Sequence, residues 1–387
     1  MTSQKNNARA NTEDYLAIFL HDIPLMDVRA PVEFARGSFP SAINAPILDD
    51  RQRELIGTCY KNVGADAAVA LGHQLATDNI RAQRLDSWQQ FTTRHPQGFL
   101  FCFRGGQRSH ITQQWLKDAG CPYPLVKGGY KALRRFLLDE LERAIEDVPF
   151  IILSGKTGTG KTQLIKQLPY SIDLEGLANH RGSSFGRRYG GQPAQIDFEN
   201  RLAIALLRHR HQNPGMPVLL EDESKLIGRC SLPQSMRDKM QMSSLILLEQ
   251  SMDERIVIGL KEYVTDNLAE FVTAYGEQKG FTHFAEGLAG SLYRIRRRLG
   301  GQRYQQLNDM LHNAIEQHQS AGKTDGYGQL IGELLSSYYD PMYDYQLAQK
   351  SAEIIFRGDS QAIVAQYDML LNEIKAHPRS LQGRVVC

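Results

Sequence analysis

The chain has 387 residues, of which 42% are hydrophobic and 23% are charged, values that are ordinary for a folded protein. Lysine and arginine total 45 against 43 aspartate and glutamate residues, so the net charge is only +2. This composition argues against intrinsic disorder, collagen and a coiled coil for the whole chain, and against a basic field that covers the whole protein. A local basic patch can cancel in the sum, so a polyanionic partner is still open.

The N-terminal sequence and the cysteines indicate the compartment. Residues 1–15 are polar and lack the apolar core of a signal peptide, and no stretch approaches the roughly 18 apolar residues of a membrane span. The five cysteines are widely spaced and contain no C-x-x-C pair, which argues against a disulfide framework or a zinc site. We therefore expect a cytoplasmic, reduced protein without a membrane partner. The cysteines are Cys59, Cys102, Cys121, Cys230 and Cys387.

The first part of the chain alternates helical and strand-like patterns. Helical patterns show apolar residues every three to four positions, and strands read as short apolar runs bounded by turns. We expect a helix and then a strand within 12–28, a helical segment at 65–95, a strand at 98–103, and helices at 109–119 and 130–148.

After Pro149 the alternation restarts and then gives way to helices. Strands are expected at 150–154, 217–222, 243–249 and 255–260, and helical segments from about 262 to 377. Strands alternating with helices imply parallel sheets with crossover helices. We predict an α/β fold with a first domain at 12–138, the end of a linker helix at 139–149, a second α/β domain at 150–262, and a helical extension at 263–387.

Residues 155–162, GKTGTGKT, match the phosphate-loop pattern G-x-x-x-x-G-K-[ST] without a mismatch. They follow an apolar strand and precede a helix, as the mechanism requires, so backbone N–H groups converge on phosphate oxygens. Lys161 would neutralise the terminal phosphates and Thr162 would bind Mg²⁺. The predicted phosphate-binding residues are Gly155, Lys156, Thr157, Gly158, Thr159, Gly160, Lys161 and Thr162.

An acidic run follows the apolar strand that ends near residue 220. Glu221, Asp222 and Glu223 would lie at the carboxyl end of that strand, where phosphate-loop enzymes orient a metal or activate a nucleophile. We predict Asp222 as a metal ligand together with Thr162, although the pattern does not choose among the three carboxylates. A solvated acidic loop is the alternative.

Cys102 ends the apolar strand of the first domain and precedes a helix. Backbone N–H groups, Arg104 and Arg108 would favour its thiolate, while Gly105 and Gly106 allow an anion-binding turn. Two chemistries share this design: transfer of sulfur or selenium through a persulfide-type intermediate, and hydrolysis of a phosphate ester through phosphocysteine. The C-x5-R spacing alone does not separate them. Among the other cysteines, only Cys59 is considered for a helper role.

The sequences around Cys102 resemble a known family. DVRAPVEF at 27–34 and VKGGY at 126–130 resemble the segments that open and close rhodanese domains. With GTCYK, ALGH, RGGQRSHI, DLEGLANHRGSSFG, LEDESKLIG, RRLGGQRY and YYDPMYDYQL in order, the chain resembles the tRNA 2-selenouridine synthase family over nearly its whole length. This resemblance implies a rhodanese-like domain followed by a P-loop NTPase-like domain.

The resemblance also implies a two-step reaction at the wobble uridine in the anticodon loop of bacterial tRNA. The sulfur of 2-thiouridine takes a geranyl group from geranyl diphosphate, and selenium from selenophosphate then displaces the geranylated sulfur. Cys102 would carry selenium; Arg104, Gly105, Gly106 and Arg108 would cradle it; Lys161 and Mg²⁺ on Thr162 would stabilise the departing diphosphate. A selenophosphate-producing enzyme is a further expected partner.

An arginine cluster in the helical extension is the predicted tRNA-binding surface. Residues 281–304 contain five arginines and one glutamate, a net charge of +4 with histidine neutral. The cluster consists of Arg294, Arg296, Arg297, Arg298 and Arg303. A solvated helix face is the alternative.

Two other functions compete with the transferase. An NTP-dependent kinase or NTPase with a regulatory rhodanese module would also use the phosphate loop. A phosphatase would use the cysteine loop, although Phe101 stands where such enzymes often carry histidine.

Overall fold

The strand and helix patterns produce two parallel sheets, each in its own unit of the chain. The computed structural model describes residues 9–377, so the last ten residues of the predicted helical extension lie outside the described residues. The first unit spans Met1–Arg143 and Ala194–Arg208, and the second spans Ala144–Pro193 and His209–Cys387. The sequence analysis assigned 194–208 to the second domain; in the structure Asn200 of this segment donates a hydrogen bond to the Ser38 carbonyl in the first unit.

The sheet of the first unit has three parallel strands in the order β2-β1-β3. They are β1 (Leu25–Asp27), β2 (Ala42–Asn44) and β3 (Phe99–Phe101). Leu125 continues the sheet beyond β3 through a parallel bridge to Leu100. The strands predicted within 23–28 and 98–103 are therefore confirmed, and the sheet ends directly before Cys102.

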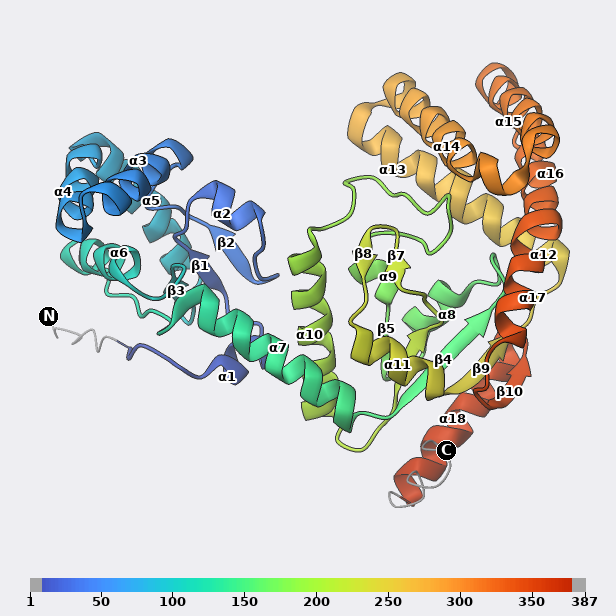
Figure 1. Cartoon of the computed structure of the whole chain (residues 1–387), viewed down its shortest axis with the longest axis horizontal. Helices are drawn as coiled ribbons and strands as arrows, with labels where there is room; N and C mark the ends of the chain where they lie inside the picture. The colour runs from blue at the N-terminus through green and yellow to red at the C-terminus, as the bar shows by residue number, and fades with distance from the viewer. Residues whose placement is uncertain (1–8, 378–387) are drawn as a thin grey trace, which may run out of the picture. The chain divides into compact units, whose positions relative to one another are not determined.

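Helices surround this sheet, and two of them form a hairpin beside its carboxyl edge. The segment predicted as helical over 65–95 splits into α4 and α5, while α3 was not predicted. Asp49 and Gln52 form a reciprocal cap that starts α3. Figure 1 shows α3 and α4 lying side by side. The helices are α1 (Tyr15–Leu20), α2 (Pro31–Ala35), α3 (Asp50–Asn62), α4 (Ala65–Leu75), α5 (Asp78–Arg94), α6 (Gln107–Asp118) and α7 (Gly129–Asp147), which continues into the second unit.

The second unit contains a five-stranded parallel sheet in the order β10-β9-β4-β6-β5. The strands predicted at 150–154, 217–222 and 243–249 are confirmed as β4, β6 and β9. Their residues are fully buried, as expected for a parallel sheet covered on both faces. The strands are β4 (Phe150–Gly155), β5 (Ser171–Ile172), β6 (Val218–Glu221), β9 (Ser244–Leu248) and β10 (Ile354–Gly358), beside a small hairpin of β7 (Leu226–Ile227) and β8 (Cys230–Ser231).

The strand predicted at 255–260 is wrong, because these residues belong to helices. Ser251 and Glu254 cap each other and start α12 (Met252–Gly259), which runs into the π-helix η1 (Leu260–Thr265). Of the β-branched residues that suggested a strand, Ile256 instead packs against the apolar core that contains Leu330 and Leu334 of α16 (Asp325–Leu334), while Val257 is exposed. Helix packing overrides strand propensity here.

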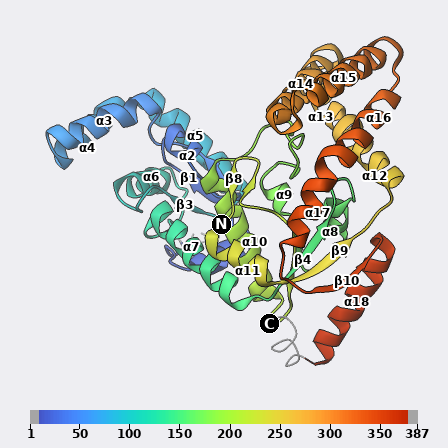
Figure 2. The same ribbon diagram turned by 45° about the vertical axis from the view of Figure 1, so that its right-hand side comes forward.

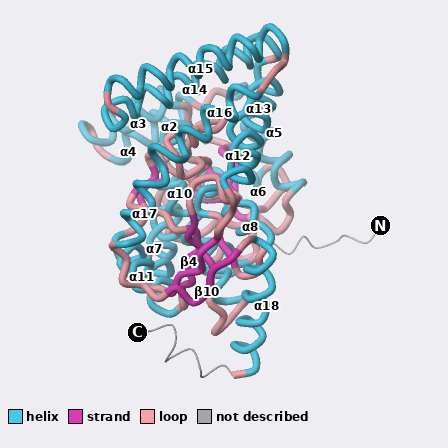
Figure 3. The backbone as a smooth tube through the Cα atoms, turned by 90° about the vertical axis from the view of Figure 1, so that its right-hand side faces the viewer, coloured by secondary structure: helices cyan, strands magenta, loops and turns pink. Residues whose placement is uncertain are grey.

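The region after 262 is largely helical, as predicted, but one strand interrupts it. β10 pairs with β9 at the edge of the sheet, and α18 (Ser360–Ala376) packs beside it, as Figures 2 and 3 show. Ile363, Tyr367 and Leu371 of α18 join the apolar core formed by β4, β6, β9 and α8 (Lys161–Gln167). The end of the chain therefore completes the sheet. The α/β class with parallel sheets and a mostly helical C-terminal region is confirmed.

Several of the remaining helices of the second unit pack around a separate apolar core. Phe284, Leu292, Leu307, Leu311 and Tyr327 are almost fully buried there. None of the helices within residues 9–377 combines the length and apolar character needed to span a membrane. The helices are α9 (Leu174–Leu177), α10 (Gln195–Gln212), which begins in the first unit, α11 (Gln234–Met242), α13 (Asp266–Tyr275), α14 (Glu277–Leu299), α15 (Gly301–Ala321), the π-helix η2 (Leu335–Tyr339) and α17 (Asp340–Ala348).

Candidate functional site

The phosphate loop, residues 155–162, connects β4 to α8. Gly158 and Gly160 have φ of +81°, in the left-handed region that favours glycine, and a Cβ at Gly158 would press against the Arg255 carbonyl. Lys161 Nζ donates to the carbonyls of Gly155 at 2.6 Å and Lys156 at 3.1 Å. The lysine ammonium is therefore held over its own loop, where it can transfer its hydrogen bonds to phosphate oxygens.

Arg255 contacts the backbone of the phosphate loop and holds it in place. Its Nε donates to the Thr157 carbonyl at 3.0 Å, and its guanidinium forms two hydrogen bonds to Asp340, at 2.9 and 2.5 Å. The Arg255 side chain is only 4% exposed. Sequence reasoning missed both residues, because they lie 85 positions apart and Arg255 falls in the segment misread as a strand.

Carboxylates face the hydroxyl that ends the phosphate loop. Thr162 Oγ1 donates to Glu175 Oε2 at 2.7 Å, and Glu175 also accepts a bond from the Gly182 amide. Burial, reinforced by the charge of Glu175, raises the pKa of Glu223 well above its usual value. Burial and the charges of Asp173 and Glu175 do the same for Glu221, which also accepts a bond from the Leu174 amide. Glu175 was not among the predicted residues, although its segment, DLEGLANHRG, was noted for its resemblance to the family.

Asp222 has other partners. Its carboxylate accepts a hydrogen bond from Ser154 and forms an ion pair with Lys350. The residue that contacts Thr162 is Glu175, so the pairing of Thr162 with Asp222 around a metal is still only a prediction. Within residues 9–377, no three or more His, Cys, Asp or Glu side chains converge closely enough to hold a metal ion by themselves.

A cavity of about 1000 Å³ adjoins this end of the phosphate loop. Thr162, Glu175 and Arg181 line it, together with His180. Burial, together with the charges of nearby arginines, Arg187 first, lowers the pKa of His180 to about 4. His180 is therefore neutral at physiological pH, and the positive charge of the cavity lining comes from its arginine and lysine side chains.

The cysteine loop, residues 102–108, lies between β3 and α6. Cys102 is 3% exposed, and its carbonyl accepts a hydrogen bond from the Tyr130 amide at 2.8 Å. A Cβ at Gly129 would collide with the Cys102 carbonyl, so the Gly-Gly pair at 128–129 permits this close approach. Gly105 has φ of +64°. The backbone of the VKGGY segment therefore packs directly against the cysteine loop.

Arg108 is fixed by Glu33, a residue that the sequence analysis did not assign to the site. Its guanidinium donates to both Glu33 carboxylate oxygens, at 2.5 and 3.2 Å. Burial alone would lower the pKa of Arg108, but the hydrogen bonds and charge of Glu33 outweigh it and raise that pKa. Arg104 is exposed, with its guanidinium 5.8 Å from the Phe103 ring. Both predicted arginines line the cavity at Cys102, and Arg104 is the more exposed of the two.

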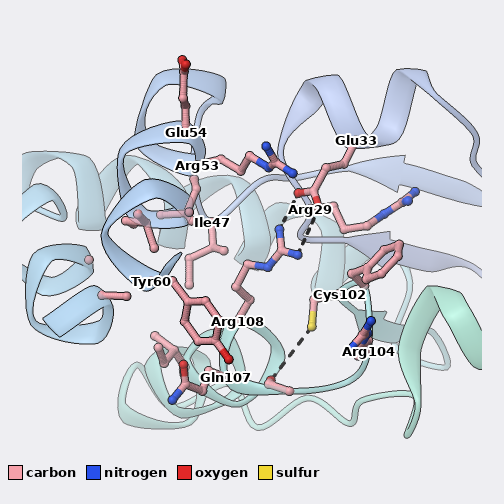
Figure 4. A pocket seen from close by; sticks show the side chains of 18 of the residues that line it. Arg29, Glu33, Ile47, Arg53, Glu54, Tyr60, Cys102, Arg104, Gln107 and Arg108 are labelled. Carbon is pink, nitrogen blue, oxygen red and sulfur yellow. Dashed lines mark hydrogen bonds and ion pairs between the residues drawn. The ribbon is translucent and has the colours of Figure 1, made fainter. Parts of the chain in front are cut away.

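Cys102 opens onto a cavity of about 1210 Å³ (Figure 4). Arg108 and Gln107 line the cavity on the side of the cysteine loop, and Ile47 and Tyr60 line it on the side of α3. The thiol Sγ lies 4.0 Å from the Gly106 carbonyl. The cavity is therefore much larger than an inorganic anion needs.

The arginine cluster lies at the end of α14 and the beginning of α15. Arg294 donates to the Ser184 carbonyl at 3.0 Å, and Arg296 stacks on Tyr293 with 3.6 Å from its guanidinium carbon to the ring centre. Arg297, Arg298 and Arg303 are exposed. The structure thus brings the five predicted arginines to one end of the helical region.

Known proteins match the chain over nearly its full length. A family model described as tRNA 2-selenouridine synthase AAA domain matches residues 148–373. A tRNA 2-selenouridine synthase of Marinobacter nauticus is 56% identical over 356 residues, covering 92% of this chain and 97% of the relative. Proteins of the same name from Hahella chejuensis and Bordetella petrii are 50% and 49% identical, covering 91% and 97% of this chain and 93% and 99% of the relatives.

Proposed function

Since the chain belongs to the tRNA 2-selenouridine synthase family, we propose that it converts 2-thiouridine in tRNA to 2-selenouridine through an S-geranyl intermediate. The observation that carries this proposal is the presence of two different anion loops in one chain. One loop offers an ammonium and a hydroxyl for a diphosphate, and the other offers a buried thiol beside a fixed guanidinium.

In the first step the sulfur of 2-thiouridine attacks C1 of geranyl diphosphate. A carbon–sulfur bond forms, the carbon–oxygen bond breaks, diphosphate leaves with the bonding electrons, and the N3 proton of the uridine is released to solvent. Lys161 would exchange its bonds to the loop carbonyls for bonds to the departing diphosphate, where negative charge accumulates. The loop amides would hold the same oxygens.

The residues around Thr162 suit Mg²⁺, which prefers oxygen ligands and usually binds one or two carboxylates together with substrate phosphates. The Thr162 hydroxyl already meets the Glu175 carboxylate, and a buried Glu221 oxygen has no hydrogen-bond partner. Mg²⁺ bound there would neutralise charge on the diphosphate. Protonation would compete with this role, because burial raises the pKa of Glu221 and Glu223.

In the second step the selenium of selenophosphate attacks C2 of the modified uridine, and the geranylated sulfur leaves as a thiolate. Water then cleaves the phosphorus–selenium bond, which releases phosphate and 2-selenouridine. Alkylation makes this departure feasible, since a thiocarbonyl sulfur is a poor leaving group. As the proposed selenium carrier, Cys102 would hold the selenium of selenophosphate through its thiol without a change of oxidation state, and Arg108, held by Glu33, would supply positive charge at the base of the loop. Arg104 with the amides of Gly105 and Gly106 would contact the selenophosphate.

The substrate is a wobble uridine, so the protein must hold a tRNA anticodon loop. We assign phosphate contacts to the exposed members of the arginine cluster, and a base-stacking role to exposed Tyr293 beside them. We place the reaction in the cytoplasm, supplied by a selenophosphate-producing enzyme.

Sequential assays with the purified full chain test the proposal. The protein is incubated with 2-thiouridine tRNA and geranyl diphosphate, selenophosphate is added, and nucleosides are analysed by mass spectrometry after each addition. S-geranyl-2-thiouridine should form first and 2-selenouridine second. Selenouridine formation without geranyl diphosphate would contradict the intermediate.

The intact phosphate loop also supports an NTP-dependent kinase or NTPase as the second candidate. Steady-state turnover of ATP or GTP that geranyl diphosphate does not inhibit would favour that function. Inhibition by geranyl diphosphate together with negligible turnover would favour the transferase.

A further inference from the structure

The cavity above Cys102 extends well beyond the anion loop into the α3–α4 hairpin. Small residues at the facing helix positions leave this space open: a Cβ added at Gly57 would meet no atom within 4 Å, and one at Gly72 would only reach ordinary contact with Ile56, at 3.6 Å. Both glycines line the cavity. An ordered helix pair with this much room between its side chains offers space for a ligand.

Apolar side chains form one part of the cavity lining beneath the hairpin, beside charged residues of the same lining such as Arg53, Lys61 and Arg84. We call this apolar part the apolar arm, and it is lined by Ile56, Ala68, Val69, Gly72, Ile111 and Trp115. Ile56 and Ile111 pack against the same core cluster that contains Trp115. Such a surface binds a phosphate or a bare nucleobase only weakly. It binds a hydrocarbon favourably, because the apolar surface of the hydrocarbon is removed from water.

The other end of the cavity is polar and holds the thiol. Cys102 and Gly106 lie there, beside the Arg108 guanidinium, which is hydrogen-bonded to Glu33 (Figure 4). Ile47 and Tyr60 lie between this end and the helix pair. A molecule that fills the whole cavity must therefore carry a polar head near the thiol and an apolar tail of several carbons.

We propose that the apolar arm binds the hydrocarbon chain of an S-alkylated 2-thiouridine while the pyrimidine lies at Cys102. This inference rests on the proposed function, which supplies a geranylated uridine as the substrate of the second step. The arm would retain alkylated uridine and discriminate against 2-thiouridine, because only the alkylated base carries a group that gains by entering it. Selectivity for the intermediate is thus built into the domain that carries the thiol.

Tryptophan fluorescence measures this binding without catalysis. The chain has two tryptophans; Trp115 lines the arm, and the ring centre of Trp88 lies 5.9 Å from that of Trp115. The full chain is titrated with the nucleosides S-geranyl-2-thiouridine and S-methyl-2-thiouridine. We expect the geranyl nucleoside to bind at least tenfold more tightly and to change the emission. Equal affinities for the two nucleosides, or no binding of either, would overturn the proposal.

Filling the arm provides the second measurement. Gly57→Leu projects a side chain into open space within an α-helix, where leucine is intrinsically more favourable than glycine. The substitution should lower the affinity for the geranyl nucleoside at least tenfold and leave the affinity for the S-methyl nucleoside unchanged. Gly72→Leu should have the same effect. Ala70→Leu, at an exposed position of α4 outside the cavity lining, is the matched control. Weakening by Ala70→Leu as large as by Gly57→Leu would contradict the assignment.

A chemical readout separates this inference from the proposed function. Gly57→Leu should raise the KM for selenation of tRNA that has been geranylated beforehand. An unchanged KM would reject the arm and leave the two-step reaction intact. Pocket-dependent binding of the geranyl nucleoside by an enzyme that forms selenouridine without geranylation would reject the two-step reaction and retain the arm.

Discussion

Arg108 donates two hydrogen bonds to Glu33, so the arginine that follows Cys102 by six residues is oriented by a carboxylate 75 positions earlier in the chain. Glu33 itself lies in the first turn of α2 and also accepts a bond from the Ala30 amide at 3.1 Å. The short helix α2 thus positions the cation of the cysteine loop. The contribution of the Glu33–Arg108 pair to the free energy of unfolding can be measured from how that free energy changes with pH.

We predict that Glu33→Gln lowers the free energy of unfolding by about 2 kcal/mol at pH 7, since it removes a charged partner of a part-buried guanidinium. Burial raises the pKa of Glu33, but the bonds and charge of Arg108 outweigh it and hold the pKa below its usual value. The pair therefore stabilises the folded state fully at pH values above about 4.3, the pKa of Glu33 in the unfolded chain. This stabilisation is lost as the pH falls through the lower pKa that Glu33 has in the folded state. Urea unfolding from pH 7 to pH 3 should show the difference from wild type shrinking below about pH 4. Glu13→Gln, in an exposed pair with Lys127, should show almost none.

Cys102→Ser should abolish 2-selenouridine while S-geranyl-2-thiouridine accumulates. The exchange removes the proposed selenium carrier and leaves the phosphate loop untouched. Nucleoside mass spectrometry after the complete reaction measures both products. Cys121→Ser is the control, because that thiol contacts Thr92, 3.1 Å away, rather than the cysteine loop. Selenouridine made by Cys102→Ser at the wild-type rate would remove Cys102 from the mechanism.

Lys161→Ala should slow geranyl transfer by at least about 100-fold, the usual cost of removing one preorganised donor to a developing anion. Lys166→Ala changes an exposed lysine on the same helix and should leave the rate within a factor of about two, since its ion pair with Asp173 lies at the surface. The initial rate of S-geranyl nucleoside formation is measured. Selenation of previously geranylated tRNA by Lys161→Ala should persist, and its loss to the same degree would argue that Lys161 acts in both steps.

Asp340→Asn should destabilise the second unit by about 3 kcal/mol, because it leaves the buried Arg255 guanidinium without its anion. The same change should weaken diphosphate binding, since Arg255 also holds the Thr157 carbonyl. Chemical denaturation and inhibition of geranyl transfer by inorganic diphosphate measure the two effects. Asp344→Asn breaks a more exposed pair with Lys156 and should cost less than about 1 kcal/mol.

Replacing Arg297 and Arg298 by alanine should weaken tRNA binding and reduce the slope of log affinity against log salt by about one for each lost phosphate contact. Both are exposed near the end of α14. Lys279→Ala, which removes one positive charge from the first turn of the same helix, is the control and is compared with the change per lost charge. A slope that changes equally in the control would show a general charge effect instead of a defined contact surface.

Short sequence motifs predicted the two loops. The side chains that contact these loops come from residues far away in the sequence and could not be predicted in the same way. The phosphate loop was predictable because eight adjacent residues carry its mechanism, and β4 and α8 appear on either side of it. Glu33, Glu175 and Arg255 could not be assigned, because each acts on a residue brought near only by the fold. The motifs that contain these residues give no indication of which side chains they contact in the folded protein.

Two of the errors in secondary structure have the same physical origin. The β-branched run at 255–260 is strand-like in isolation, yet a capped start and a packing surface make it helical. β10 was not predicted, because its edge position leaves its residues only half-buried and its apolar pattern short. In both places tertiary packing outweighs local propensity.

The placement of β10 has a consequence for synthesis of the protein. The partner of β9 in the sheet is made more than one hundred residues later, after the entire helical region. While the ribosome is still adding those residues, one edge of β9 has no strand to form hydrogen bonds with. The apolar core beside the sheet also lacks Ile363, Tyr367 and Leu371 until they are synthesised. The phosphate-loop unit should therefore fold late and cooperatively, with its helices emerging as a long insertion inside an unfinished sheet.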